Sequence, residues 1–301
     1  LVCPFHGWVY NLDGTLRGPS RPHSFPSLDK VAFGLTPLET EIWMGFVFIR
    51  FEKGPQGSVA DLLKPFGEEF GHYRAETMIP TKGFWTHVSD VNWKSVRDVD
   101  NEGYHVAMAH PALQDLYGST YYDEPFVNGI CRSFATYSPH AGRRWSVRNY
   151  VKISEDAQHL PEHLRKAWIY YGIFPNAVIA VTPETVQFYQ EFPLDKKRSL
   201  LRGGVYRYRE ESRRAHAARY LAMRIDRDTQ AEDVQLTIWS NEAMASKSFG
   251  NFYLSDLEYG VRTHHDHLRD VLPVMTLERA PHETEIAEIN RSMRKAKGRP
   301  D

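Results

Sequence analysis

His105 and His110 are two residues whose types and spacing could do chemistry. Two imidazoles and one carboxylate on one side of an iron ion leave its other positions open for oxygen and substrate. On a regular helix, residues five positions apart point about 140° away from each other, so the two rings would diverge. Pro111 disfavours helical backbone at His110 and would end the helix there, which allows convergence. The alternative is a pair of structural histidines near a helix end.

Cys3 and His6 form a second pattern, in the stretch "CPFHGW". A thiolate and an imidazole at this spacing suit zinc, or an iron–sulfur centre in which two histidines replace two cysteines on one iron. Gly7 permits a tight turn that keeps the backbone close to a ligand. The alternative is a buried cysteine beside a surface histidine. Cys131, the other cysteine, has no histidine at the spacing needed to complete the set.

The elements that must position these residues divide the chain into three parts. Residues 1–52 are short and β-like, with a hairpin around Asp13-Gly14 and an apolar β run in "IWMGFVFIRF". Residues 53–79 are predicted to be a connector that leads into a helix. Residues 80–301 alternate between strand-like and helical stretches, which is typical of an α+β domain with an antiparallel sheet packed by helices. The tail from residue 289 onward is expected to fray.

Composition restricts the class of protein. The 301 residues carry a net charge of -1, so no basic surplus points to nucleic acid or to an anionic membrane surface. No apolar run approaches the ~18 residues of a spanning helix, and the N-terminus lacks a signal-peptide pattern. Two cysteines cannot build a disulfide framework and suit a reducing compartment. We therefore expect a cytoplasmic protein.

Two segments together resemble one known family. The stretch "CPFHGWVYNLDGTL" resembles the second half of a Rieske motif, and Asn92-Trp93-Lys94 with Tyr104-His105 and His110-Pro111 resembles the iron-binding signature of Rieske non-heme iron oxygenase α subunits. The implied fold is the C-terminal part of a small all-β Rieske domain followed by a helix-grip catalytic domain. In that family a first Cys-x-His pair lies shortly upstream. We therefore expect an N-terminally truncated copy that carries half of the ligands of a Rieske [2Fe-2S] cluster, Cys3 and His6.

The resemblance also implies a ligand set for mononuclear Fe(II). His105 and His110 take the places of the two imidazole ligands. Asp233 is expected to be the third ligand, because "AEDVQ" resembles the Glu-Asp pair of the family's long helix. Its neighbours along the chain, Glu232, Asp226 and Asp228, are expected to be solvated helix charges. The family's Gln-containing stretch downstream has Asn241 here.

Two further acids receive roles from the resemblance. Glu102 takes the place of the acidic residue that bridges the Rieske cluster and the iron between neighbouring subunits. Asp98 is expected to orient the ligating imidazoles, as carboxylates beside ligating histidines commonly do. The family usually has Asn directly after the position of Asp98, and this chain has Val99.

The implied function is that of a terminal oxygenase component. Such a subunit uses O2 and electrons from a reductase, with or without a ferredoxin, to hydroxylate or oxidatively demethylate a small organic substrate. The implied assembly is a homotrimer or an α3β3 ring. Glutamate at position 102 resembles the branch that acts on carnitine-like and betaine-like quaternary amines, whereas aromatic compounds are the alternative. Aromatic side chains of "WIYYGIFPNAVIAV" could stack on a ring or surround a methylated ammonium.

Two other functions use the same residues. A mononuclear zinc hydrolase could bind its metal through the three predicted ligands, with Glu102 as general base. A helix-grip module could instead enclose an apolar ligand without metal. His264, His265 and His267 are predicted to lie on a solvated helix face, because positions i, i+1 and i+3 scatter around a helix.

Overall fold

The computed structural model describes residues 1–51, 57–154, 157–250 and 252–296, and the chain divides into two compact units, Leu1–Val59 and Ala60–Asp301. The division falls inside the range 53–79 that was predicted to be a connector. Residues 53–56 of that range lie outside the described residues. Most of the remainder is helical, because α1 (Val59–Gly71) occupies it as the apolar spacing predicted. No described helix is long and apolar enough to cross a bilayer.

The first unit consists of two β-hairpins. In the first, β1 (Val9–Tyr10) pairs with β2 (Leu16–Gly18), and Asp13 Oδ1 accepts hydrogen bonds from the backbone N–H and the hydroxyl of Thr15 at 2.9 and 2.7 Å. This confirms the predicted turn. The apolar run of residues 42–51 is not one strand, because the backbone reverses at Met44-Gly45, where both φ angles are positive. The products are β3 (Glu39–Trp43) and β4 (Phe46–Arg50).

The second unit is built on an antiparallel sheet, which has eight strands among the described residues. Its order is β5-β12-β11-β10-β9-β8-β7, and β6 also pairs with β12. The strands are β5 (Ile79–Pro80), β6 (Trp85–Ser89), β7 (Tyr122–Val127), β8 (Ile130–Thr136), β9 (Ala167–Ile173), β10 (Ala177–Thr182), β11 (Thr185–Pro193) and β12 (Ser199–Arg207). Residues 90–92 lead from β6 into a helix that begins at Trp93.

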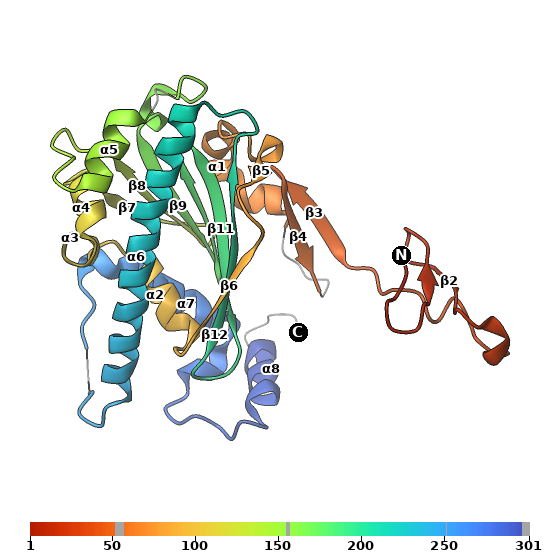
Figure 1. The fold of residues 1–301 in the computed structure, drawn as a ribbon. Coiled ribbons are helices and arrows are strands. Elements are labelled where there is room, and N and C mark those ends of the chain that lie inside the picture. Colours follow the sequence, from red (N-terminus) through yellow and green to blue (C-terminus); the bar gives the residue numbers. More distant parts are fainter. Residues whose placement is uncertain (52–56, 155–156, 251, 297–301) are drawn as a thin grey trace. The chain divides into compact units, whose positions relative to one another are not determined.

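Helices cover both faces of this sheet (Figure 1). They are α1, α2 (Trp93–Asp100), α3 (Val106–Ala109), α4 (Pro111–Tyr117), α5 (Trp145–Ile153), α6 (Arg213–Ala245), α7 (Tyr259–Val271) and α8 (Ile286–Ala296). Successive side chains of a strand point to opposite faces. On β9, Tyr171 packs against Phe66 and Phe70 of α1, whereas Trp168 packs against Tyr117 of α4 and Tyr150 of α5.

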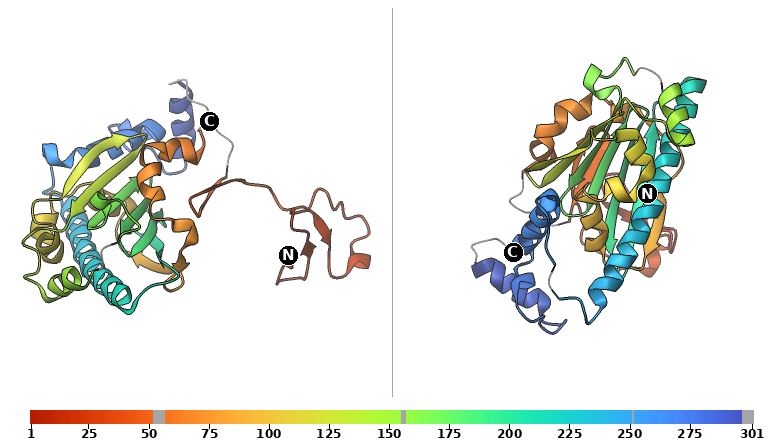
Figure 2. Two further views of the ribbon diagram at one scale, coloured as in Figure 1. Left: turned by 90° about the horizontal axis from the view of Figure 1, so that it is seen from above. Right: turned by 90° about the vertical axis from the view of Figure 1, so that its left-hand side faces the viewer.

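The long helix α6 crosses the second of these faces (Figures 1 and 2). Its first turn is capped by Ser212, whose hydroxyl accepts a hydrogen bond from the Ala215 backbone N–H. Its buried side chains recur every three or four residues, as one helix face requires. Besides Arg219, they are Ala218, Leu221, Ala222, Ile225, Thr229 and Thr237, and the first four of these pack with α4, α5 and β9 in the main hydrophobic core. α6 therefore has one inward face along most of its length.

Two sequence predictions for the C-terminal region are wrong. His264 is not solvated, because it lies on the buried stripe of α7 between Gly260 and Leu268 and is only 1% exposed. The segment after residue 289 does not fray at once, because α8 continues to Ala296. Residues 297–301 lie outside the described part of the chain.

The core contains one carboxyl group whose ionisation should affect stability. Glu184 accepts a hydrogen bond from the Tyr150 hydroxyl at 2.9 Å, and burial raises the pKa of Glu184 to about 7. Between the unfolded-state pKa near 4.5 and this value, the folded protein retains a proton that the unfolded chain loses. Stability contributed by this proton is therefore present below pH 4.5 and is lost as the pH rises to 7.

We predict that Glu184→Gln, which cannot ionise, removes this pH dependence. Relative to the variant, the wild-type protein should lose about 3 kcal/mol of unfolding free energy between pH 4.5 and pH 8. Urea denaturation of both proteins at the two pH values measures the difference. If the difference in unfolding free energy between the two proteins were the same at both pH values, Glu184 would ionise in the folded protein as it does in the unfolded chain.

Candidate metal centre

The segment from α2 to α4 brings His105 and His110 together. His105 precedes α3, and His110 separates α3 from α4 with non-helical backbone angles, φ -115° and ψ 79°. Pro111 occupies the first turn of α4, where a missing N–H costs nothing. The prediction that Pro111 ends the helix at His110 is confirmed. As a result the two imidazoles converge, and their Nε2 atoms lie 3.0 Å apart.

Close packing on β7 fixes the loop in front of His105. A Cβ atom on Gly103 would lie 1.8 Å from the ring of Tyr121, so only glycine fits there. The Gly103 N–H donates to Asp123 Oδ2 at 2.9 Å, and the Tyr121 hydroxyl donates to Asp123 Oδ1 at 2.7 Å. The loop therefore cannot retreat from the sheet, and this restricts where Glu102 and His105 point.

Asp233 of α6 completes a triad with the two histidines. Its Oδ1 atom lies 2.9 Å from His110 Nε2 and 3.6 Å from His105 Nε2. The structure thus brings the three predicted ligands together, with one donor atom of each within 4.8 Å of the other two. Asp233 Oδ1 is buried, and the described groups nearest to it are the two Nε2 atoms, which offer it a proton only when a ring is charged. A buried carboxylate oxygen in that situation calls for a cation.

Two glutamates form hydrogen bonds with the Nδ1 atoms of the two imidazole rings. His105 Nδ1 lies 2.5 Å from Glu102 Oε1, and His110 Nδ1 lies 2.9 Å from Glu232 Oε2. An ionised carboxylate only accepts, so each Nδ1 carries the proton and donates it. In the neutral rings the two Nε2 atoms then bear lone pairs that face each other and Asp233. Such carboxylate–histidine pairs are the usual outer support of a metal site.

The electrostatics of the triad are consistent with a cation at its centre. Burial alone would lower the pKa of His105, but Asp233 and Glu102 outweigh it and raise that pKa to about 10. The pKa of His110 is raised for the same reason by Asp233 and Glu232. Burial would raise the pKa of Asp233, yet the two histidines hold it below its usual value. Without metal a proton therefore occupies the site, and a metal ion would displace it.

The sequence analysis predicted both Asp226 and Glu232 to be solvated charges, and both predictions are wrong. Asp226 accepts a hydrogen bond from Gln187 of the sheet, and Glu232 contacts His110. The register of α6 could have revealed Glu232, because Asp233 lies four residues from both Thr229 and Thr237 on the buried stripe, and Glu232 lies beside it. Asp228 does point outward as predicted, where it pairs with Arg227.

The remaining predicted residues lie elsewhere. Asp98 pairs with His265 of α7, its Oδ1 lying 2.8 Å from His265 Nε2, and no described hydrogen bond joins it to His105 or His110. The predicted orienting role thus falls to Glu102 and Glu232. Cys3 and His6 bracket a tight turn in the first unit, in which the Gly7 N–H donates to the Cys3 carbonyl at 3.0 Å with Gly7 at φ +70°. Cys3 is a free, half-buried thiol.

A cavity of 380 Å³ in the second unit opens onto the triad. It is walled by aromatic side chains, among them Trp85, Tyr170 and Tyr189. Two carboxylates besides the metal-facing ones also line it, Asp100 and Asp226. The size suits a small organic molecule.

Residues 80–273 match the family model described as the ring hydroxylating alpha subunit (catalytic domain). The chain belongs to this family. Among curated ring-hydroxylating relatives, the carnitine monooxygenase oxygenase subunit of Escherichia coli K12 is 26% identical over 215 residues, which cover 70% of this chain and 53% of that subunit. The chloroplastic choline monooxygenase of Beta vulgaris is 33% identical over 114 residues, which cover 36% of this chain and 25% of that enzyme.

Solved structures of two oxygenases have the same fold. A quaternary ammonium Rieske monooxygenase superposes with a TM-score of 0.70 at 20% identity, covering 89% of this chain and 71% of that chain. Naphthalene 1,2-dioxygenase from Rhodococcus sp. superposes with a TM-score of 0.62 at 14% identity, covering 92% and 76%. At these identities the likeness shows the fold alone.

Two expectations are confirmed, the relationship to oxygenase α subunits of this family and the α+β fold. The expected class of enzyme and its cofactors, mononuclear iron and a Rieske cluster, belong to the proposal below. The chain spans about half the length of the first curated relatives it matches.

Removal of the Glu232 carboxylate should weaken metal binding. We predict that Glu232→Ala raises the Kd for Fe(II), or for Co(II) as a spectroscopic substitute, by 10- to 100-fold, on the order of the loss typical of outer-shell partners. Anaerobic titration of the metal-free protein measures this. Asp228→Ala, on the same helix but facing outward, should bind as wild type. Equal affinity of the two variants would contradict the role of Glu232.

Proposed function

We propose that this chain is the catalytic part of a Rieske-type terminal oxygenase that hydroxylates or oxidatively demethylates a small quaternary amine. The observation that carries the proposal is the triad of His105, His110 and Asp233 at the wall of a cavity. Two imidazoles and a carboxylate on one side of an ion are the donor set of non-heme Fe(II) oxygenases. Iron bound there would supply the activation of O2.

The chain's own residues prepare the site in three ways. Glu102 and Glu232 hold the Nδ1 protons and so direct both Nε2 lone pairs at the ion. Asp233 supplies the negative charge. The aromatic walls exclude water, which strengthens electrostatic interactions inside the cavity.

Charge in the cavity supports a cationic substrate. Asp100 lies 3.5 Å from Arg97, so its charge is partly compensated. Asp226 accepts hydrogen bonds only from neutral amides among the described contacts, those of Gln187 at 3.4 Å and Gln230 at 2.9 Å. Burial raises the pKa of Asp226 to about 6, so it is mostly ionised at neutral pH. An ionised, uncompensated carboxylate beside tyrosine and tryptophan rings suits a methylated ammonium better than a neutral hydrocarbon.

Electron supply completes the proposal. Cys3 and His6 would provide two of the four ligands of a Rieske [2Fe-2S] cluster, and Glu102 would link the cluster of a neighbouring subunit to His105. A reductase, with or without a ferredoxin, would deliver the electrons to a trimeric or α3β3 assembly. Glu102 is suited to this link, because its Oε1 bonds His105 Nδ1 while its Oε2 accepts the His105 backbone N–H at 3.1 Å.

Metal identity distinguishes the oxygenase from the zinc hydrolase and the metal-free binding module. We expect anaerobically purified protein to contain mononuclear iron bound by His105, His110 and Asp233. His105→Ala should lose the iron, as measured by elemental analysis. Iron retained by this variant, or a wild-type protein that takes up none when reconstituted with Fe(II), would refute the proposed site.

Substrate charge can be tested by binding. We predict that choline binds at least about tenfold more tightly than its neutral isostere 3,3-dimethylbutan-1-ol, and that Asp226→Asn removes the preference. Calorimetric titration of the Fe(II)-loaded protein under nitrogen measures both ligands, and carnitine and glycine betaine extend the series. Asp228→Asn, which leaves the cavity unchanged, is the matched control. Equal binding of choline and the isostere, or tighter binding of naphthalene, would favour an aromatic substrate.

A further inference from the structure

His264 of α7 has a ring nitrogen for which the described structure provides no partner. Its Nε2 lies 2.9 Å from the backbone carbonyl oxygen of Pro175. A carbonyl only accepts, so Nε2 carries the proton and donates it. Burial lowers the pKa of His264 to about 4, which makes the ring neutral at neutral pH. Nδ1 therefore bears a lone pair, and it is buried without a hydrogen bond.

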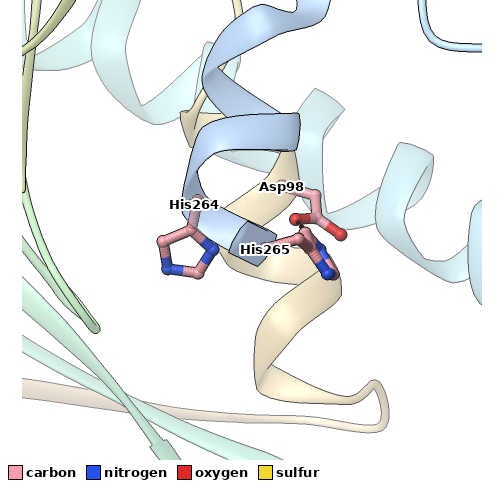
Figure 3. Close-up of side chains that lie close together, drawn as sticks. All are labelled: Asp98, His264 and His265. Atoms are coloured by element: carbon pink, nitrogen blue, oxygen red, sulfur yellow. Dashed lines mark hydrogen bonds and ion pairs between the residues drawn. The ribbon is translucent and has the colours of Figure 1, made fainter. Parts of the chain in front are cut away.

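Asp98 of α2 and His265 of α7 lie beside this nitrogen. One donor atom from each of Asp98, His264 and His265 lies within 4.8 Å of the other two. Figure 3 shows one ring nitrogen of His264 on the side where the Asp98 carboxylate and the His265 ring meet. The rings of Trp93 and Phe174 flank His264, with centroids 6.3 and 5.5 Å away. The cluster is thus walled by apolar groups on the His264 side.

A hydrogen bond within the cluster cannot satisfy His264. Its Nδ1 and the Asp98 carboxylate are both acceptors, so neither has a proton to offer the other. A buried acceptor without a partner costs about 1–3 kcal/mol. An ion that binds both removes this penalty. A histidine that donates one N–H to a backbone carbonyl and turns its other nitrogen inward has the arrangement typical of a metal ligand.

We propose that Asp98, His264 and His265 form a second divalent-cation site, suited to zinc, that joins α2 to α7. Two imidazoles, a carboxylate and one water make a tetrahedral set, with ligands 2.0–2.2 Å from the ion and about 3.4 Å from one another. The present spacing needs a small contraction. Asp98 and His265 can supply it by shifting together toward His264, because their paired atoms already lie 2.8 Å apart and their side chains are 31% and 24% exposed.

Two cationic side chains near the cluster lower its affinity for a metal ion, but neither occupies the site. Arg97 faces Glu191 and Asp100, which offset its charge. Lys94 donates to the Asn92 side chain at 2.8 Å, and burial lowers the pKa of its amine. The ion would be separate from the one at His105, because its histidines come from α7 and the two clusters share no residue. By joining α2 to α7, the ion would restrict the movement of α2, the helix that precedes Glu102.

The site can be tested with zinc in a protein whose triad has been removed. In metal-stripped His105→Ala/His110→Ala protein we expect one Zn(II) to bind, and zinc at 100-fold above its Kd to raise Tm by about 5–10 °C. Adding His265→Ala should abolish the shift and raise the Kd at least about 100-fold. Adding Asp98→Asn, which preserves side-chain shape, should do the same.

His267→Ala is the matched control, because it removes another histidine of α7 that does not belong to the cluster. It should leave both the zinc stoichiometry and the size of the Tm shift unchanged, whatever its effect on the metal-free Tm. The inference is overturned if the double variant binds no zinc, or if His267→Ala weakens binding as much as His265→Ala. Either result leaves the proposed oxygenase function intact, since the two sites share no ligand.

Discussion

The burial of Arg97 is the constraint on which the active region depends. This guanidinium is 1% exposed, and it lies 3.4 Å from Glu191 of β11 and 3.1 Å from the Asn101 side-chain oxygen. A buried charge that loses its partner costs about 3–5 kcal/mol, so α2 can take only the rotation that keeps Arg97 over Glu191. Gly172 makes room, because a Cβ there would lie 2.6 Å from the guanidinium. The loop after α2 then starts from a fixed position.

Local rules were sufficient for the part of the site that is close in sequence. Pro111 predicted the helix break at His110, and Asp13-Gly14 predicted the hairpin. Both predictions depend on the backbone preferences of single residues. Residues 42–51 were predicted to be a single β run, whereas they contain a turn. Methionine rarely adopts a left-handed backbone conformation, so the sequence did not indicate the turn at Met44.

Orientation of polar residues on helices was harder to predict. The inward face of α6 is lined largely by alanine and threonine, so its apolar stripe is faint and Glu232 looked like any surface acid. On α7 a histidine occupies the middle of the buried stripe, and only the carbonyl of Pro175 explains why it can lie there. Both facts come from tertiary contacts, which no local pattern encodes.

The triad joins two distant parts of the chain, because 122 residues separate His110 from Glu232, the neighbour of Asp233. An ion bound by all three would therefore act as a reversible cross-link that closes a very long loop. Closing such a loop removes more conformational freedom from the unfolded chain than from the folded one. Binding of the ion would therefore stabilise α6 as a whole, and backbone amides along the entire helix would exchange their hydrogens more slowly.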